Sequence, residues 1–364
     1  TTTFRQQLGS LPVQDDFVAL FPGGKVYSSE NGCFAKTFGL DEDDEPTIYG
    51  GTTRPDAWLE NTHTDPDGTV DFFDDSYTAN GRSTFPLANI RHRNPSGLPP
   101  VNYLLLLTRN ENIIPAVAKL KREQAAAYFM LGETKGTSAG GAAEMGKSLR
   151  VPGTNPFFFT NDALQGKRLL ELLETMPDLE VYLMSTGRVG GEDDDERSKK
   201  VRIKHSSAVV QGIVEGTIVW EEDPDFGYFV AADLPGFPDP EILQPRRLYD
   251  RQGRMDEYNA IVSQLDTERK EFLRSFPGLD ESLTGEVLLD RRNPLPRRHF
   301  EHEAAGHAWE AARGQGRSGE GARADHELVG GRSLAETPVG IGEKSLVAPP
   351  DLRLGEGEGI LRIG

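Results

Sequence analysis

The chain has a single cysteine, Cys33, among its 364 residues. One cysteine excludes an intramolecular disulfide and any zinc site built from several cysteines. Long apolar runs are also missing. The longest, around residues 103–107, is the length of a strand and falls far short of the ~20 residues that span a bilayer. No signal peptide is recognisable. These absences predict a soluble protein of the reducing cytoplasm, without a membrane partner.

Positive charge is scarce relative to negative charge. The chain has 58 acidic and 40 basic residues, a formal net charge of −18. Such an excess repels phosphate backbones, so we expect no nucleic-acid partner. The acidic residues concentrate in two runs, 41–44 and 192–196, which predict solvated loops.

The pattern of apolar residues favours alternating strands and helices. A chain of this length suggests about two domains. Residues 1 to about 50 predict strands and loops, and 201–219 mixes strand and helix signals. Strands are expected at 70–73, 102–108 and 179–186, and helices at 115–131, 161–176 and 257–276. Strand 102–108 is apolar enough to be central in a sheet. Residues 1–284 therefore predict a mixed α/β domain.

The composition changes near residue 285. From there to Gly364 the chain is rich in Gly, Arg, Glu and Ala, poor in aromatics and without sustained periodicity. This composition predicts a disordered tail over 285–364, the alternative being a frameshifted or otherwise non-native extension. We assign it no function.

Two short motifs suggest chemistry that their surroundings do not support. Residues Gly141–Ser148 satisfy G-x-x-x-x-G-K-[ST], but that pattern binds phosphate only between a strand and a helix. Here a predicted helix precedes it, and the following residues contain Pro152 and Pro156, which prevent a helix. His302 and His307 resemble a zinc-protease motif, but a spacing of five places them on different helix faces. We therefore expect neither a P-loop kinase nor a metal hydrolase.

A longer series of motifs carries a family resemblance. Asn31–Thr37, followed by Glu45–Tyr49, is similar to the G-C-Y-A-K and E-P-E-I-Y segments of ATP-dependent phosphoenolpyruvate carboxykinases. Further segments match in the family's order: Leu59–Asn61, Gly68–Phe72, Asn80–Pro86 (family N-T-R-x-x-Y-P), Val181–Gly187, Lys200–Lys204 (family K-R-I-S-I-K), Leu234–Gly236 and Glu241–Arg246. The resemblance runs from residue 1 to about 277. It implies the family's mixed-sheet, P-loop-type nucleotide-binding domain.

The N-terminus resembles the end of that family's P-loop. There a G-K-T-T sequence precedes an Asp-Asp pair by about a dozen residues, and here Thr1–Thr3 precede Asp15 and Asp16 similarly. The resemblance implies that Thr1 or Thr2 is a Mg²⁺ ligand. A threonine-rich start without that role is the alternative. Because the first residue is not methionine, we expect the sequence to be part of a longer protein, truncated at its P-loop.

The family converts oxaloacetate and ATP to phosphoenolpyruvate, ADP and CO₂ in gluconeogenesis. The resemblance implies that Asp16 ligates Mn²⁺ and that Asp15 orients magnesium-bound water or the P-loop lysine. Arg82 would bridge substrate and γ-phosphate. Without the family context, a turn would explain the Asp pair and a surface salt bridge would explain Arg82.

The same resemblance implies a nucleotide site. It assigns contacts with ATP to Lys36, Glu45, Lys200, Val201 and Ser206, in addition to Thr1, Thr2 and Arg82. Ser206 keeps the hydroxyl of the family's threonine. Lys200 stands where the family has an arginine, so the planar guanidinium is lost at that position. Cys33 is expected to be a small buried residue and not a nucleophile.

The family also uses an N-terminal domain, which supplies a substrate arginine, a tyrosine, and a lysine and histidine for Mn²⁺. The 364 residues contain no segment that matches it, so this polypeptide alone is expected to be nearly inactive. The alternative is a non-catalytic nucleotide-binding remnant or pseudogene product of the family.

Overall fold

A mixed sheet of five strands organises the main part of the structure, a computed structural model that describes residues 10–14, 18–109, 112–136, 146–155 and 158–285. All of these residues belong to one compact unit. The strands, in spatial order, are β15 (Val219–Glu222), β16 (Phe229–Asp233), β9 (Val117–Leu120), β12 (Glu180–Ser185) and β8 (Tyr103–Thr108). Strand β12 is parallel to β8 and antiparallel to β9, and the remaining pairs are antiparallel.

Both faces of this sheet are covered. Along β12, Val181 and Leu183 face one buried cluster, the first core, whereas Tyr182 and Met184 face another, the second core. This alternation follows from the pleat, which points successive side chains to opposite faces. Because each face is apolar, the strand reads as a continuous hydrophobic run, which is typical of a sheet buried on both sides.

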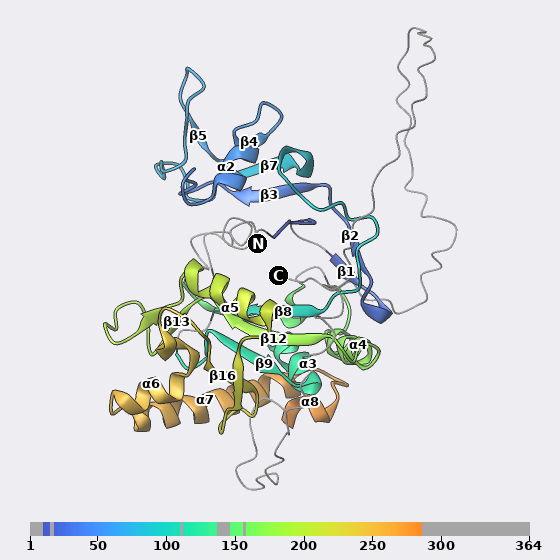
Figure 1. Cartoon of the computed structure of the whole chain (residues 1–364), viewed down its shortest axis with the longest axis vertical. Helices are drawn as coiled ribbons and strands as arrows, with labels where there is room; N and C mark the ends of the chain where they lie inside the picture. Colours follow the sequence, from blue (N-terminus) through green and yellow to red (C-terminus); the bar gives the residue numbers. More distant parts are fainter. Residues whose placement is uncertain (1–9, 15–17, 110–111, 137–145, 156–157, 286–364) are drawn as a thin grey trace, which may run out of the picture. The chain divides into compact units, whose positions relative to one another are not determined.

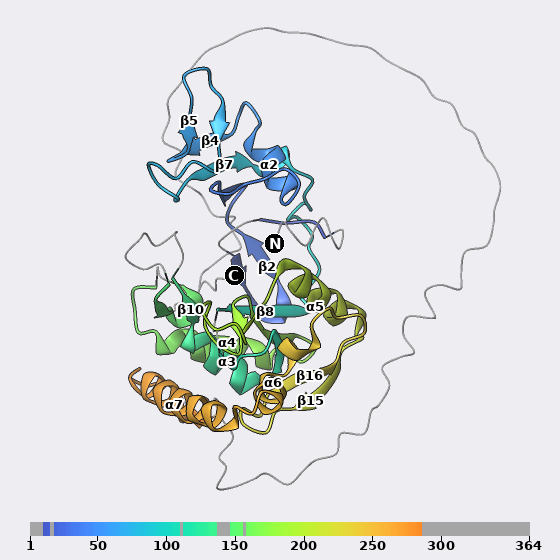
Figure 2. The same ribbon diagram turned by 90° about the vertical axis from the view of Figure 1, so that its left-hand side faces the viewer.

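Helices on the two faces supply the rest of these cores. The first core is completed by α3 (Arg122–Leu131), α4 (Ala163–Glu174), α7 (Met255–Arg274) and α8 (Glu281–Gly285). The second is completed by α5 (Ile203–Glu215), the 3₁₀ turn η5 (Pro240–Leu243) and α6 (Pro245–Arg251). Figures 1 and 2 show α5 and α7 on opposite sides of the sheet. The result is a mixed α/β fold of three layers.

A smaller antiparallel sheet has a core of its own. Its strands are β3 (Gly32–Lys36), β7 (Arg82–Pro86) and β4 (Trp58–Glu60), with β7 in the middle. Helix α2 (Pro46–Thr52) packs on β7. Cys33, Ile48 and Phe85 lie in this third core. Cys33 is 4% exposed, which confirms the expectation of a small buried residue.

Short hairpins and turns complete the described residues. The hairpins are β1 (Val18–Leu20) with β2 (Val26–Ser28), β5 (His63–Thr64) with β6 (Val70–Asp71), β10 (Glu133–Lys135) with β11 (Ser148–Arg150), and β13 (Arg188–Val189) with β14 (Lys199–Lys200). The remaining 3₁₀ turns are η1 (Pro22–Gly24), η2 (Leu87–Asn89) and η4 (Pro152–Thr154).

Several sequence expectations are confirmed. Strands β8 and β12 and helices α4 and α7 lie where the periodicity predicts them. The 192–196 run lies in an exposed loop in which ion pairs join Glu192 to Lys135, Asp193 to Arg188 and Asp195 to Arg197. Among the helices in the described ranges, none combines the length and apolar run needed to cross a membrane. Residues 286–364 fall outside those ranges, so the disordered tail and the boundary at 284 stay predictions.

Three expectations were wrong. The helix predicted over 115–131 begins at Arg122, because Val117–Leu120 forms β9 at the centre of the sheet. Residues 46–52 form helix α2 instead of a loop or strand, with Pro46 at its first turn, where a missing N–H costs nothing. Strand β8 lies at the end of the described strand order and not at its centre.

Helix α3 ends where the chain requires a glycine. Gly132 has φ of +49°, and a Cβ there would lie 1.8 Å from the carbonyl oxygen of Val151. Both the left-handed conformation and the close backbone approach exclude other residues. The same residue connects α3 to β10.

A buried ion pair holds β10 against helix α7. Arg269, which is 0% exposed, donates from Nε and Nη2 to the two carboxylate oxygens of Glu133 at 2.9 and 2.7 Å. Arg150 of β11 lies 2.9 Å from the same carboxylate, and Tyr128 of α3 accepts from Arg269 at 3.2 Å. Burial raises the pKa of Glu133, but the two arginines outweigh it and lower the pKa overall.

Removal of one member of this pair leaves a buried charge unmatched. We expect Glu133→Gln to lower the free energy of unfolding by about 3–5 kcal/mol. Glu171→Gln, which breaks surface pairs with Lys167 and Arg168, should change it by less than about 0.5 kcal/mol. Urea denaturation of both variants measures the difference. Equal effects would contradict the role assigned to Glu133.

Candidate functional site

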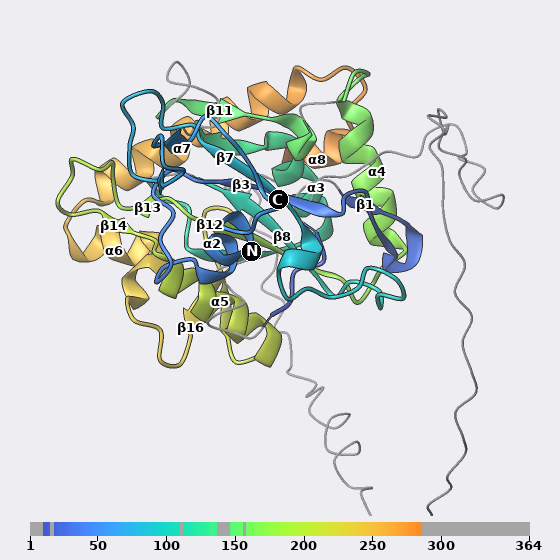
Figure 3. The same ribbon diagram turned by 90° about the horizontal axis from the view of Figure 1, so that it is seen from above.

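Two predicted site residues meet across the smaller sheet. Lys36 ends β3, Arg82 begins β7, and the antiparallel register places them directly opposite each other. Figure 3 shows the two strands side by side. Opposed residues of an antiparallel pair have neighbouring Cβ atoms, so segments 46 positions apart in sequence contribute two cations to one place.

The Arg82 side chain is 9% exposed and is therefore not part of a surface salt bridge. Its Nη1 donates to the carbonyl oxygen of Gly81 at 3.0 Å, and its guanidinium lies 5.9 Å from the centre of the Phe34 ring. The Phe34 side chain is itself half exposed. The bond and the ring restrict the conformations open to a long side chain, which favours a fixed position for the charge.

The residue before Arg82 is a glycine for a steric reason. A Cβ on Gly81 would lie 2.2 Å from the Thr37 hydroxyl and 2.9 Å from that of Thr62. These hydroxyls are hydrogen-bonded to each other at 2.9 Å, and the Thr37 N–H donates to the Gly81 carbonyl. The close approach joins the ends of β3 and β7 and thereby fixes Lys36 and Arg82 relative to each other.

The electrostatics of Lys36 favour an anionic ligand. Burial lowers its pKa, and the charges of Arg82 and Arg109 lower it further. Arg109 directly follows β8 and was not among the predicted site residues. A phosphate or carboxylate beside Lys36 would offset the repulsion from the two arginines, which favours an anionic ligand at this position.

Glu45 lies at the N-cap of α2, and its carbonyl accepts from the Tyr49 N–H at 3.0 Å. The preceding acidic residues form a turn, in which Asp41 Oδ1 accepts from the N–H groups of Asp43 and Asp44. Helix α2 then packs its Gly51 against the ring of Phe85 on β7. Glu45 and Arg82 are thus carried by elements that pack together.

The other predicted nucleotide residues form a second group. Lys200 ends β14 and is exposed, whereas Val201 is 5% exposed and donates from its N–H to the carbonyl of Gly187 at 2.9 Å. Ser206 lies in the first half of α5 and is partly buried. The structure brings these three residues together around the start of α5.

The predicted metal ligands lie outside the described residues. These are Thr1, Thr2, Asp15 and Asp16. Within the ranges that the structure does describe, no three histidine, cysteine or carboxylate side chains gather to form a metal site. The assignments of Mg²⁺ and Mn²⁺ therefore stay predictions.

Comparison with known proteins identifies the family. A family profile described as phosphoenolpyruvate carboxykinase matches residues 1–240. The chain belongs to the phosphoenolpyruvate carboxykinase family. Relatives named phosphoenolpyruvate carboxykinase (ATP) include that of Pelobacter propionicus, 31% identical over 241 residues, which are 64% of this chain and 44% of the relative. That of Aeropyrum pernix is 32% identical over 276 residues, which are 73% of this chain and 51% of the relative.

The relative from Afipia carboxidovorans is 32% identical over 284 residues, which are 75% of this chain and 51% of the relative. The chain thus spans about half the length of the curated relatives it matches. The family resemblance inferred from the motifs is confirmed. One departure from the carboxykinase pattern now has a structural explanation: Gly81 replaces a threonine because Thr37 and Thr62 occupy the space of its Cβ.

The P-loop-like motif lies on a hairpin and not at a helix. Of Gly141–Ser148 the structure describes Gly146, Lys147 and Ser148. Gly146 and Lys147 exchange backbone hydrogen bonds with Gly136, and Ser148 begins strand β11. A strand in place of a helix confirms that this motif lacks the context of a phosphate loop in the carboxykinase family or elsewhere. His302 and His307 lie outside the described residues.

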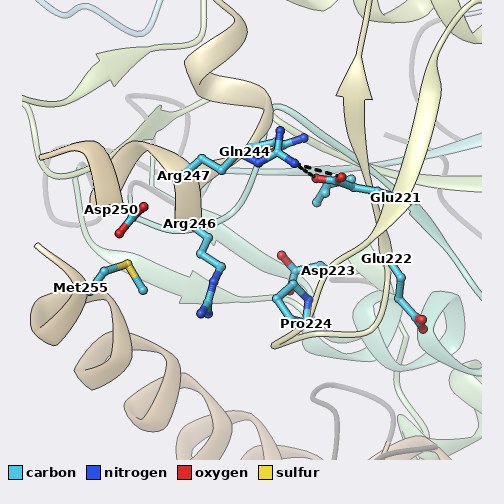
Figure 4. Close-up of a pocket in the computed structure, with 10 residues that line it drawn as sticks. Glu221, Glu222, Asp223, Pro224, Gln244, Arg246, Arg247, Asp250 and Met255 are labelled. Atoms are coloured by element: carbon cyan, nitrogen blue, oxygen red, sulfur yellow. Dashed lines mark hydrogen bonds and ion pairs between the residues drawn. The ribbon is translucent and has the colours of Figure 1, made fainter. Parts of the chain in front are cut away.

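A pocket of about 420 Å³ lies apart from both groups of site residues. Its walls come from the β15–β16 hairpin, from α6 and from Met255 at the start of α7, as Figure 4 shows. Its arginines are paired, Arg247 with Glu221 at 2.8 Å and Arg246 with Asp225 at 2.6 Å. Asp223, which lines the pocket, is 6% exposed, and burial raises its pKa to about 6 despite two N–H donors to Oδ1.

The raised pKa of Asp223 predicts a pH dependence of stability. Between about pH 4 and 6 the folded protein keeps a proton that the unfolded chain has lost, so rising pH lowers the free energy of unfolding. Asp223→Asn removes this loss. Between pH 5 and pH 8, we expect the free energy of unfolding of the variant to rise by about 1–3 kcal/mol relative to that of the original protein, as measured by urea denaturation. The exposed Asp178→Asn should show no such gain, and equal pH profiles would contradict the prediction.

Proposed function

We propose that this chain provides the nucleotide-binding part of an enzyme that converts oxaloacetate and ATP to phosphoenolpyruvate, ADP and CO₂. Family membership supports this proposal. The observation that carries it is the register of β3 and β7, which places Lys36 opposite a buried Arg82. We further propose a cytoplasmic location and a role in gluconeogenesis, as the family resemblance implies.

The reaction requires cations near two groups that become negatively charged in succession, the enolate and the transferring phosphoryl group. Cleavage of the bond between C3 and the C4 carboxylate of oxaloacetate releases CO₂ and leaves its electron pair in the enolate of pyruvate. The enolate oxygen then attacks the γ-phosphorus of ATP, and the bond to ADP breaks. Charge accumulates on the enolate oxygen and on the equatorial phosphoryl oxygens. Fixed cations stabilise such charge more in the transition state than in the ground state.

In this proposal Arg82 serves both charges, because a planar guanidinium can bind two oxygens at once. Lys36 adds a second positive charge beside it. In this proposal Glu45 contacts the nucleotide from the α2 side. The base and ribose are held by Lys200, Val201 and Ser206.

We propose that divalent cations complete the site, with Mn²⁺ on Asp16 and Mg²⁺ on Thr1 or Thr2. Hard oxygen ligands suit both ions. Such ions neutralise charge on the transferring phosphoryl group. Asp15 would orient a magnesium-bound water or the lysine of the P-loop.

Substitution of Arg82 tests the proposal in the protein that carries this chain. We expect Arg82→Gln to lower kcat/KM for phosphoenolpyruvate formation by roughly 10³-fold or more, because an arginine that stabilises phosphoryl transfer is worth about 10³–10⁵ in rate. Arg82→Lys should recover part of this loss, since lysine keeps the positive charge but lacks the planar guanidinium that binds two oxygens.

Two controls separate this result from a general loss of structure. Arg91→Gln alters an exposed arginine that follows the same motif, and Lys147→Ala alters the P-loop-like hairpin. Neither should change kcat/KM by more than about twofold. Unchanged activity of Arg82→Gln would contradict the assignment. ATP binding without any phosphoenolpyruvate formation would instead favour the alternative, a non-catalytic nucleotide-binding member of the family.

The metal assignment has a separate test. We expect Asp16→Asn to weaken Mn²⁺ binding by at least about tenfold, because the neutral amide replaces a charged ligand. Electron paramagnetic resonance of free Mn²⁺ measures the affinity directly. Asp44→Asn, in an exposed turn, is the matched control. Equal affinities for the two variants would exclude Asp16 as the ligand.

A further inference from the structure

His205 is a buried ring at the start of α5. Its side chain is 2% exposed, and Nδ1 accepts a hydrogen bond from the backbone N–H of Arg202, the N-cap residue, at 2.9 Å. Nε2 lies 2.8 Å from Oδ2 of Asp239. Because Nδ1 accepts, the ring proton is on Nε2, which donates to Asp239. The observed arrangement therefore requires a neutral imidazole.

Helix α3 begins in the same way with a different side chain. Gln124 is the third residue of α3, as His205 is of α5. Its Oε1 accepts from the N–H of the N-cap residue Lys121 at 3.2 Å, and its Nε2 donates to the carbonyl of Phe226 at 2.9 Å. Both side chains accept from their own helix start and donate to a residue outside the helix, one before β16 in the sequence and one after it. Only the one in α5 can titrate near neutral pH.

The N-cap residue of α5 is held through its N–H and its carbonyl. The Arg202 carbonyl accepts from the N–H groups of His205 and Ser206 at 2.9 and 3.2 Å. Its own N–H goes to the His205 ring. Val201 precedes it with a buried side chain, so the ring bond fixes the backbone between Val201 and Ser206.

We propose that His205 is a positioning residue for nucleotide binding, whose neutral imidazole fixes the first turn of α5 and hence Lys200, Val201 and Ser206. The inference rests on the nucleotide site proposed above. Protonation would turn Nδ1 into a donor facing another donor. The bond to Arg202 would be lost, and the first turn would loosen where the nucleotide is held.

The charges around the ring affect the pH at which His205 gains a proton. Asp239 accepts from it, and Lys204 lies 3.5 Å from the same carboxylate. Nearby on η5, Glu241 pairs with Lys199 at 2.7 Å and with Arg251 at 3.5 Å. Burial lowers the pKa of His205 more than Asp239 raises it, and the charges of Lys204 and Arg202 lower it further. The ring is therefore neutral at pH 7.5 and gains a proton only in mildly acidic solution.

The test compares the original protein with His205→Gln, which copies the helix start of α3 and cannot titrate. The dissociation constant of Mg·ATP is measured by isothermal titration calorimetry between pH 7.5 and 5.5. Over this range, we expect the dissociation constant of the original protein to rise about three- to tenfold more than that of the variant. Asp223 and the γ-phosphate of ATP titrate in the same window, but both are common to the two proteins and cancel in the comparison.

Parallel pH profiles would overturn the inference while leaving the nucleotide site in place. An absence of ATP binding at any pH would instead overturn the nucleotide assignment itself. His205→Asn, which keeps an acceptor near the position of Nδ1, is the second variant and should give the same pH profile as His205→Gln.

Nitrogen NMR of the imidazole gives a readout that does not need the nucleotide. The chain has seven histidines, and the imidazole signal that is absent from the spectrum of His205→Gln is assigned to His205. We expect an unprotonated Nδ1 and a protonated Nε2 at pH 7.5, with a change to the doubly protonated ring at a lower pH than for an exposed histidine. The opposite tautomer, or a ring already charged at pH 7.5, would exclude the role of His205.

Discussion

Arg269 carries a permanent positive charge into the apolar layer beside the main sheet, where a charge has to be matched. Glu133 matches it from β10, and Tyr128 of α3 and Arg150 of β11 extend the contact. Three segments that begin more than 100 residues before α7 are thereby held to this helix. Apolar packing alone would tolerate small shifts of α7 along the first core. A two-oxygen bond to a fixed carboxylate does not, so it specifies one position of the helix.

The smaller sheet shows how a register can build a site. Residues that end one strand and begin another become neighbours only through antiparallel pairing, and a slip of one residue would turn Arg82 to the opposite face. The contact between Gly81 and Thr37 disfavours a shift of register, because only a residue without a Cβ fits opposite Thr37. The local sequence around Arg82 therefore serves the placement of its charge as well as the strand.

The parts of this fold with strong local patterns were predictable, and those set by tertiary contacts were not. Helices α4 and α7 have one apolar stripe each, and β12 is a clear apolar strand. By contrast, Val117–Leu120 has no period that separates a buried strand from a buried helix, and its neighbours β12 and β16 decide the outcome. The family motifs suggested Lys36 and Arg82 as candidate site residues. Arg109 and His205 were missed because their roles depend on contacts with residues distant in sequence, although the third position of a helix is a recognisable capping position.

The order of strands in the main sheet has a consequence for how the protein is made. Strand β9 pairs on one side with β12 and on the other with β16, so it emerges from the ribosome long before either partner. At about 5–20 residues per second, synthesis from Leu120 to Phe229 takes roughly 5–20 s. Until β12 emerges, both edges of this apolar strand lack their final neighbours, and the edge that pairs with β16 lacks its neighbour for the whole interval. A nascent chain of this topology therefore exposes unpaired strand edges for longer than one in which neighbouring strands follow each other in sequence.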